Sequence, residues 1–167
     1  MIACTADHVD DDSVDYAELA NVEVIKDIVL HYSDSAITRV IVKGPEMWRY
    51  SDVKNPSSKF VRGVEVEFLD PNGNPQGWLE ADYAENKEIK KLMVCRGNVL
   101  LYNNKNERLR TSELIWDEKE KIFYTDKFVK ITRPDGDIQG YGFKANQNFT
   151  EFEILVVEGE KEYALPE

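Results

Sequence analysis

Apolar and polar residues alternate along most of this chain. The clearest examples are residues 64–68, which read VEVEF, and residues 152–154, which read FEI. Alternation with a period of two predicts a β-strand that has one apolar and one polar face. Many of the apolar positions hold Val, Ile, Phe, Tyr or Trp, the side chains that strands prefer. The pattern therefore predicts a succession of strands that begins near Val22.

Three stretches of the chain can be aligned with one another, and they begin at residues 79, 109 and 138. Each consists of a strand-like run, a polar turn, a second strand-like run and another turn. A looser copy spans residues 37–68. A repeat of this kind, about 30 residues long, is typical of stacked supersecondary units that share one continuous core.

Polar turn signals form two series that lie half a repeat apart. Residues 70–74 (DPNGN) and 134–137 (PDGD) belong to one series, and residues 117–120 (DEKE) and 146–148 (NQN) belong to the other. Asn-Gly and Asp-Gly supply the positive φ angles of tight hairpins. The two series mark opposite ends of the strands, so we expect strands of one phase in one sheet and those of the other phase in a second.

The predicted fold class is all-β, a twisted open stack of antiparallel strands whose two sheets face each other in a jellyroll-like or taco-like arrangement. At 167 residues the chain is expected to form one domain. We assign residues 1–14 to a disordered leader or tether, residues 15–160 to a single β-repeat domain and residues 161–167 to a C-terminal tail.

An open stack leaves its first and last strands with unpaired backbone groups. Such edges are templates for strand addition from another chain. Val22 and Val24 near the N-terminus and Ile154 and Val156 near the C-terminus are the candidate partner-binding edge residues.

The net charge of −11, from 21 basic and 32 acidic residues, argues against a nucleic-acid partner, which would need a basic face. No run of 18 apolar residues is present to span a bilayer. Two interpretations of the start of the sequence stay open. Cys4 either closes the apolar part of an export signal and is a candidate lipidation site, or it follows an accidental cut. Cys95, inside the apolar run LMVC, is expected to be a small buried side chain.

Residues for catalysis or metal binding are not evident. His8 and His31 have no Cys, His or carboxylate neighbours at the spacing of metal ligands. Glu80 and Asp82 alternate with apolar residues, which indicates a solvated strand face rather than a glycosidase pair. We therefore predict no catalytic residue, no metal, no cofactor and no enzymatic activity. Aromatic residues such as Trp116 and Phe123 are expected to pack in the core rather than to line a sugar site.

Several motifs resemble LptC, the bridging protein family of lipopolysaccharide export, in their order and spacing. The resemblance covers roughly residues 15–157. The motifs are residues 22–25 (VEVI), 32–35 (YSDS), 44–47 (GPEM), 62–68 (RGVEVEF), 79–84 (LEADYA), 96–99 (RGNV), 111–117 (TSELIWD), 124–131 (YTDKFVKI), 140–143 (GYGF) and 148–149 (NF).

The resemblance implies a periplasmic protein attached to the inner membrane. Such proteins take lipopolysaccharide from an ABC transporter complex and pass it to a soluble periplasmic bridge protein of related fold, without a cofactor. The N-terminal edge would meet the transporter and the C-terminal edge the bridge protein. Family members usually carry an N-terminal transmembrane helix, which this sequence lacks, so either Cys4 serves as the anchor or the helix has been removed.

The proposed lipid-binding positions are the inward residues of the alternating runs. They are Val64, Val66, Phe68, Leu79, Ala81, Val94, Val99, Leu101, Leu109, Leu114, Ile122, Val129, Ile131, Phe143, Ile154 and Val156. A dry core would show the same alternation, and a slip of one residue would exchange the two faces. Two other functions stay open: a structural adapter that joins partners by edge-strand addition without binding lipid, and a carbohydrate-active β-sandwich enzyme.

Overall fold

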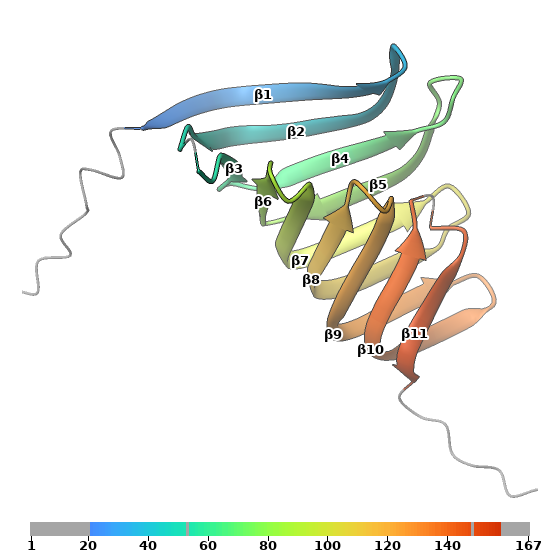
Figure 1. The fold of residues 1–167 in the computed structure, drawn as a ribbon. Coiled ribbons are helices and arrows are strands. Elements are labelled where there is room, and N and C mark those ends of the chain that lie inside the picture. Colours follow the sequence, from blue (N-terminus) through green and yellow to red (C-terminus); the bar gives the residue numbers. More distant parts are fainter. Residues whose placement is uncertain (1–20, 53, 148, 158–167) are drawn as a thin grey trace, which may run out of the picture.

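The computed structural model describes residues 21–157 except residues 53 and 148, and this part of the chain forms eleven strands and no helix. The strands are β1 (Val22–Asp34), β2 (Ile37–Tyr50), β3 (Ser57–Phe60), β4 (Val64–Leu69), β5 (Pro75–Ala81), β6 (Tyr83–Lys87), β7 (Leu92–Asn103), β8 (Arg108–Asp117), β9 (Ile122–Arg133), β10 (Gly136–Asn146) and β11 (Phe152–Val157) (Figure 1). The leader, the tail and Cys4 lie outside the described residues.

The strands form one antiparallel sheet with the order β11-β10-β9-β8-β7-β5-β4-β2-β3-β6. Strand β1 pairs only with β2, and β6 also pairs with β7. This arrangement confirms the predicted all-β antiparallel stack. No helix within the described ranges is long and apolar enough to cross a membrane.

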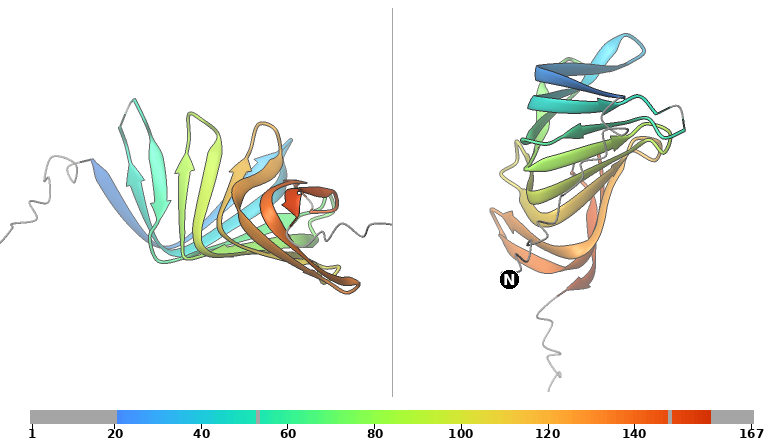
Figure 2. Two further views of the ribbon diagram at one scale, coloured as in Figure 1. Left: turned by 90° about the horizontal axis from the view of Figure 1, so that it is seen from below. Right: turned by 90° about the vertical axis from the view of Figure 1, so that its left-hand side faces the viewer.

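The long strands bend, and the bends fold the sheet into two walls. In β7, for example, residues 92–96 pair with β6, whereas residues 100–103 pair with β5. We call these the β3–β6 wall and the β4–β5 wall, and each includes the halves of β2 and β7–β10 that continue it. Figure 2 shows the strands turning from one wall into the other along a common crease. Each long strand therefore contributes to both sheets, and the expectation that alternate strands belong to separate sheets is wrong.

β-bulges and glycines at the crease make the bends. Register shifts lie between Arg96 and Val99 in β7 and between Tyr141 and Phe143 in β10. Gly97 has a φ of 76°, and a Cβ there would lie 2.9 Å from Asp82 Oδ2. Extra residues on one strand of a pair bend the strand and increase its twist. The same Asp82 carboxylate accepts a 2.6 Å hydrogen bond from Asn98 Nδ2, which ties the two sides of the crease together.

Apolar side chains on the inner faces of the walls form one core. An inner row on the β4–β5 wall runs directly from strand to strand, because each member is the register partner of the next: Val42, Val66, Leu79, Leu101, Leu109, Ile131 and Ile138. The corresponding row on the β3–β6 wall is Met93, Trp116, Phe123, Ala145 and Phe152. The two rows face each other across the space between the walls.

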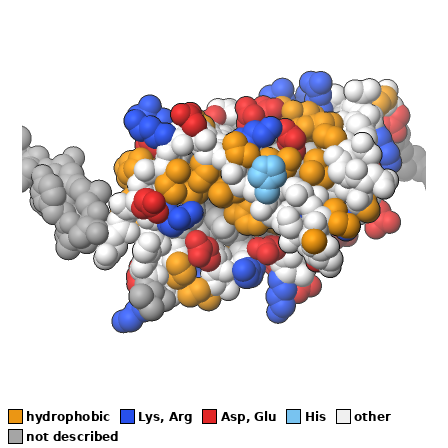
Figure 3. All heavy atoms as spheres, turned by 90° about the horizontal axis from the view of Figure 1, so that it is seen from above, with side chains coloured by type: hydrophobic (Ala, Val, Ile, Leu, Met, Phe, Trp, Pro, Cys, Tyr) orange, Lys and Arg blue, Asp and Glu red, His pale blue; other side chains and the backbone are white. Residues whose placement is uncertain are grey.

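The two ends of the stack expose apolar side chains. Val24 and Val29 on β1 are each 52% exposed, and apolar side chains gather on the face over β1 and β2 (Figure 3). At the other end, Leu155 and Val156 on β11 are also exposed. The structure thus places Val22, Val24, Ile154 and Val156 on the outermost strands, since β11 pairs only with β10 and β1 only with β2.

Candidate functional site

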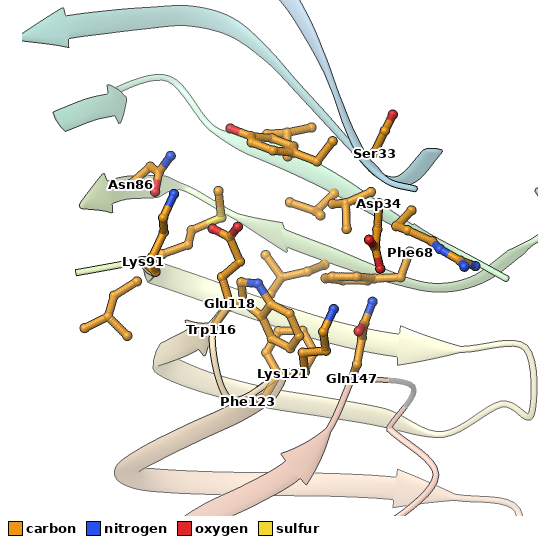
Figure 4. Close-up of a pocket in the computed structure, with 18 residues that line it drawn as sticks. Ser33, Asp34, Phe68, Asn86, Lys91, Trp116, Glu118, Lys121, Phe123 and Gln147 are labelled. Atoms are coloured by element: carbon orange, nitrogen blue, oxygen red, sulfur yellow. The ribbon is translucent and has the colours of Figure 1, made fainter. Parts of the chain in front are cut away.

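A cavity of about 130 Å³ lies between the walls in the N-terminal half of the molecule (Figure 4). Its inner surface is apolar, and polar or charged side chains surround its mouth. The apolar lining comprises Val40, Val42, Val66, Phe68, Leu79, Leu92, Met93, Trp116 and Phe123. Around the mouth lie Tyr32, Ser33, Asp34, Arg39, Asn86, Lys91, Glu118, Lys121 and Gln147. An apolar interior with a polar rim is suited to an amphiphile.

Strand pairing places the apolar lining. On one wall, Val40 is opposite Phe68 and Val42 is opposite Val66, so alternate residues of β2 and β4 point the same way. On the other wall, Trp116 is opposite Phe123. These positions share the inward face because side chains alternate between the two faces of a strand.

Three aromatic rings close the inner end of the cavity. Phe68 comes from the β4–β5 wall, and Trp116 and Phe123 come from the β3–β6 wall. The ring centroids of Phe68 and Phe123 are 5.3 Å apart at 90°, those of Phe68 and Trp116 are 6.0 Å apart, and those of Trp116 and Phe123 are 4.7 Å apart. Tilted and edge-to-face pairs at these separations attract one another. The three rings therefore connect the two walls, and we refer to them as the aromatic partition.

Two repeat-related turns carry the two lysines of the mouth. Lys91 and Lys121 have positive φ values of 56° and 55° and occupy equivalent positions before β7 and β9. Tyr32 approaches these turns from β1: burial raises the pKa of its hydroxyl above the usual range, and the charges of Glu118 and Glu88 raise it further. None of the ion pairs recorded within residues 21–157 joins the walls across the mouth.

The lipid-binding positions predicted from the sequence fall into groups according to whether they line the cavity, line the hollow at the crease or lie in the core. Val66, Phe68 and Leu79 line the cavity. Val64 and Ala81 belong to the core and also line a separate hollow of about 690 Å³ at the crease, whose other lining residues include the charged Lys43, Glu65 and Glu80. The remaining core members, each 1% exposed or less apart from Leu101 at 2%, are Val99, Leu101, Leu109, Leu114, Val129, Ile131 and Phe143. Ile154 is partly buried and packs against this core.

The structure differs from the predicted inward set at Ile122 and at Val156, and Val94 is buried at 5% exposure but lies outside the core cluster. Cys95 and Phe123 are core members, so their strand neighbours Val94 and Ile122 lie on the opposite face. Both differences arise where two apolar residues are adjacent, because alternation alone cannot then choose the inward one. Val156 pairs with Tyr141, follows it to the outer face beyond the bulge at Gly142, and is 61% exposed.

Sequence reasoning missed several residues of the cavity. Val40, Val42 and Met93 are absent from the predicted set. Trp116 and Phe123 are predicted to pack in the core, which the structure confirms for the fully buried Phe123, but both rings also line the cavity. Val40 and Val42 flank Ile41 in an unbroken apolar run, so the sequence indicates that the two valines share a face but not which face is inward. Contact between Phe68 and Trp116 joins residues 48 positions apart, and no local pattern indicates it.

The C-terminal half holds a second aromatic cluster, which is buried. Phe143 is 5.9 Å from Phe149 and 6.0 Å from Phe152, measured between ring centroids, and Phe149 and Phe152 are 5.4 Å apart. Phe143 and Phe149 are 1% and 2% exposed. This half of the space between the walls is therefore filled by side chains, as in an ordinary protein core.

Other candidate groups for chemistry are held in structural contacts. Cys95 is fully buried as predicted, and burial raises the pKa of its thiol to about 12. Glu80 accepts a 2.9 Å hydrogen bond from Tyr102 and, like Asp82 at the crease, lies away from the cavity. Within the described ranges, no three His, Cys, Asp or Glu side chains are arranged to hold a metal ion.

Comparison with known proteins adds a family assignment. A family model described as "Lipopolysaccharide-assembly, LptC-related" matches residues 29–160, which span every strand from the middle of β1 to β11. No curated protein matches the chain.

Proposed function

Because the chain belongs to the lipopolysaccharide-assembly, LptC-related family, we propose that it accepts lipopolysaccharide from an inner-membrane ABC transporter complex and passes it to a soluble periplasmic bridge protein of related fold. As a member of this family, the chain takes part in lipopolysaccharide transport, and it works in the periplasm in association with the inner membrane. The source, the direction and the recipient of the lipid are the parts that we propose.

The observation that carries the proposal is the apolar cavity between the walls with its polar mouth. Keeping an acyl chain in water costs about 0.8 kcal/mol for each CH₂ group. Contact with Val40, Val66 and Leu79 offsets that cost without breaking a bond. The polar mouth leaves the sugar and phosphate groups of the lipid in water.

The size of the cavity indicates how much of the lipid it accepts in this conformation. At about 130 Å³ it is close to the engineered cavity of roughly 150 Å³ that binds benzene. It has room for one end of an acyl chain, and deeper entry requires the walls to separate. We propose that the lipid enters at this cavity and then follows the two inner rows toward β11.

The outermost strands supply the proposed contacts with partner proteins. We propose that β1, with Val22 and Val24, joins the periplasmic part of the transporter, and that β11, with Ile154 and Val156, joins the bridge protein. Both strands have one unpaired edge among the described residues, which favours addition of a strand from another chain. Cys4, outside the described residues, is the proposed lipid anchor if no transmembrane helix is attached.

Light-induced crosslinking tests the lipid-binding proposal. A photoreactive residue replaces Val66, Val99 or Ile131 in turn, and Glu65 and Lys130 serve as exposed controls on the same strands. After lipopolysaccharide is added, we expect adducts at the inward positions and none at the controls. A folded protein without adducts at any of the five positions would contradict the proposal and leave the lipid-free adapter as the better explanation.

A further inference from the structure

We propose that Trp116 acts as a movable gate, which holds the first acyl chain in the N-terminal cavity until its indole ring turns away. The inference rests on the proposed lipid transfer and deepens it, because it names a residue that controls passage along the groove. In this proposal Trp116 is a positioning residue that contacts the acyl chain and takes part in no reaction.

The aromatic partition connects the two walls at the end of the cavity. Phe68 reaches from the β4–β5 wall to within 5.3 Å of the Phe123 centroid and 6.0 Å of the Trp116 centroid. Figure 4 shows Phe68, Trp116 and Phe123 pointing toward one another from opposite walls. A chain that enters from the N-terminal side meets these rings before it reaches the C-terminal half.

Trp116 is the ring of the three with freedom to move. Phe123 is 0% and Phe68 is 4% exposed, so surrounding atoms hold both in place. Trp116 is only partly buried, and it packs against the core while it lines the cavity. Trp48 is anchored by a 2.8 Å hydrogen bond from its indole nitrogen to Glu46, whereas the described residues provide no such bond for Trp116.

Beyond the partition, the space between the walls has no room for a chain in this conformation. Leu101 is 2% exposed, and Leu109 and Ile131 are fully buried on one wall. On the other wall, Phe143 packs against Phe149 and Phe152. Passage therefore requires an opening step, and rotation of the least confined ring is the smallest movement that removes contacts between the walls.

The test compares lipid labelling on the two sides of the partition. Photoreactive residues at Val66 and at Ile131 report the N-terminal cavity and the C-terminal half, and each is placed in the parent protein, in Trp116→Ala and in Trp116→Phe. Trp78→Ala is the matched control, because Trp78 stacks on Tyr102 at 5.3 Å and lies outside the cavity lining. The readout is the ratio of Ile131 adducts to Val66 adducts at early times after lipopolysaccharide addition.

We expect Trp116→Ala to raise this ratio roughly tenfold, because it removes two aromatic contacts that each shift an equilibrium several-fold. Trp116→Phe should give an intermediate ratio, and Trp78→Ala should leave it unchanged. An unchanged ratio in Trp116→Ala, or an equal rise in Trp78→Ala, would overturn the gate. Absence of adducts at both Val66 and Ile131 in the parent protein would instead overturn lipid binding itself.

A second measurement covers the case in which Trp116→Ala does not fold, as judged by its thermal melting. In a protein with Trp48→Phe and Trp78→Phe, Trp116 is the only tryptophan and reports its own surroundings by fluorescence. We expect its emission to change when lipopolysaccharide is added, in parallel with adduct formation at Ile131. Emission that stays constant while Ile131 becomes labelled would overturn the gate, because the chain would then have passed without moving the ring.

Discussion

The N-terminal and C-terminal halves of this molecule are built on the same pattern but differ in what lies between the walls. The inner row of the β4–β5 wall runs through both. Val42, Val66 and Leu79 are buried and also line a cavity, whereas Leu101, Leu109 and Ile131 are buried without bordering that cavity. The residues are aliphatic on both sides of this change. The difference comes from the opposite wall, where Phe143, Phe149 and Phe152 fill the C-terminal half.

The ends of the stack differ in a related way. Strand β1 has 13 residues and lies over β2 with several exposed apolar side chains. Strand β11 has six residues and rests on two glycines of β10: a Cβ at Gly142 would lie 2.9 Å from Leu155, and one at Gly140 would collide with the Val156 carbonyl oxygen. The N-terminal end of the stack is therefore a long strand. At the C-terminal end, β11 can pair with β10 only because Gly140 and Gly142 have no side chains.

Thiol reactivity should separate cavity from core by the largest factor. In a Cys4→Ser protein, Cys95 is the only thiol; in a second protein with Cys95→Ser added, Val40→Cys places the thiol in the cavity lining. We expect maleimide to label the cavity thiol at least roughly a thousandfold faster, because a core thiol reacts only when the structure opens. Similar rates would show that the cavity lining is as inaccessible as the core around Cys95.

The pKa of Cys95 adds a pH dependence to the same protein. Burial raises this pKa to about 12 in the folded state, above the value of about 8.5 for a free thiol. The folded state therefore favours the neutral thiol. Its contribution to stability is fully present below pH ~8.5 and is lost as the pH rises toward 12. Urea unfolding between pH 7 and 10 should show this loss, and Cys95→Ala should not.

Truncation of a phenylalanine should be more damaging in the core than at the cavity. Phe143→Ala removes a 1% exposed ring with two aromatic neighbours, and we expect a loss of about 4 kcal/mol in the free energy of unfolding. Phe68→Ala should cost less, about 3 kcal/mol, because one side of this ring already faces the cavity. Urea denaturation measures both, and a larger loss for Phe68→Ala would contradict the contrast.

The sequence predicts which residues share the inner face, but it does not predict where the space between the walls is empty. Alternation predicted that Val66, Leu79, Leu101 and Ile131 share one face, and the structure aligns them in one row. It could not predict which members face a cavity, because that depends on aromatic rings from the other wall. The contact of Phe68 with Phe123 is a long-range contact, and long-range contacts leave no periodic signal.

The crease also limits what alternation can predict. Odd-numbered residues point inward throughout β7 and β9, whereas the inward phase changes in β8 between Thr111 and Leu114. The reason is that β7 has one more residue at the crease than β8 does, so only one strand of the pair changes phase. The same change at Gly142 in β10 moves Val156 outward.

A side chain beneath β11 should loosen the C-terminal end without disturbing the N-terminal half. Gly140→Ala forces β11 away from β10, and we expect a loss of about 2 kcal/mol together with faster hydrogen exchange of the β11 amides. Gly77→Ala is the matched control in β5, where the nearest atom to an added Cβ is 3.5 Å away and no rearrangement is needed. Unchanged hydrogen exchange of the β11 amides would mean that the pairing of β11 with β10 tolerates a methyl group at residue 140.

Ion pairs on the outer faces should have the smallest effect and should not distinguish the halves. Arg49 and Glu23 in the N-terminal half and Lys130 and Asp137 in the C-terminal half both approach to 3.4 Å, and all four side chains are substantially exposed. Water and salt screen such pairs, so double-mutant cycles should give less than about 1 kcal/mol for either. A much stronger coupling in one half would mean that surface charge, and not the filling between the walls, makes the halves different. Equal, weak couplings would mean that surface charge does not distinguish the halves. The interior aromatic side chains would then be what makes one half a cavity and the other a core, although both halves have the same strand pattern.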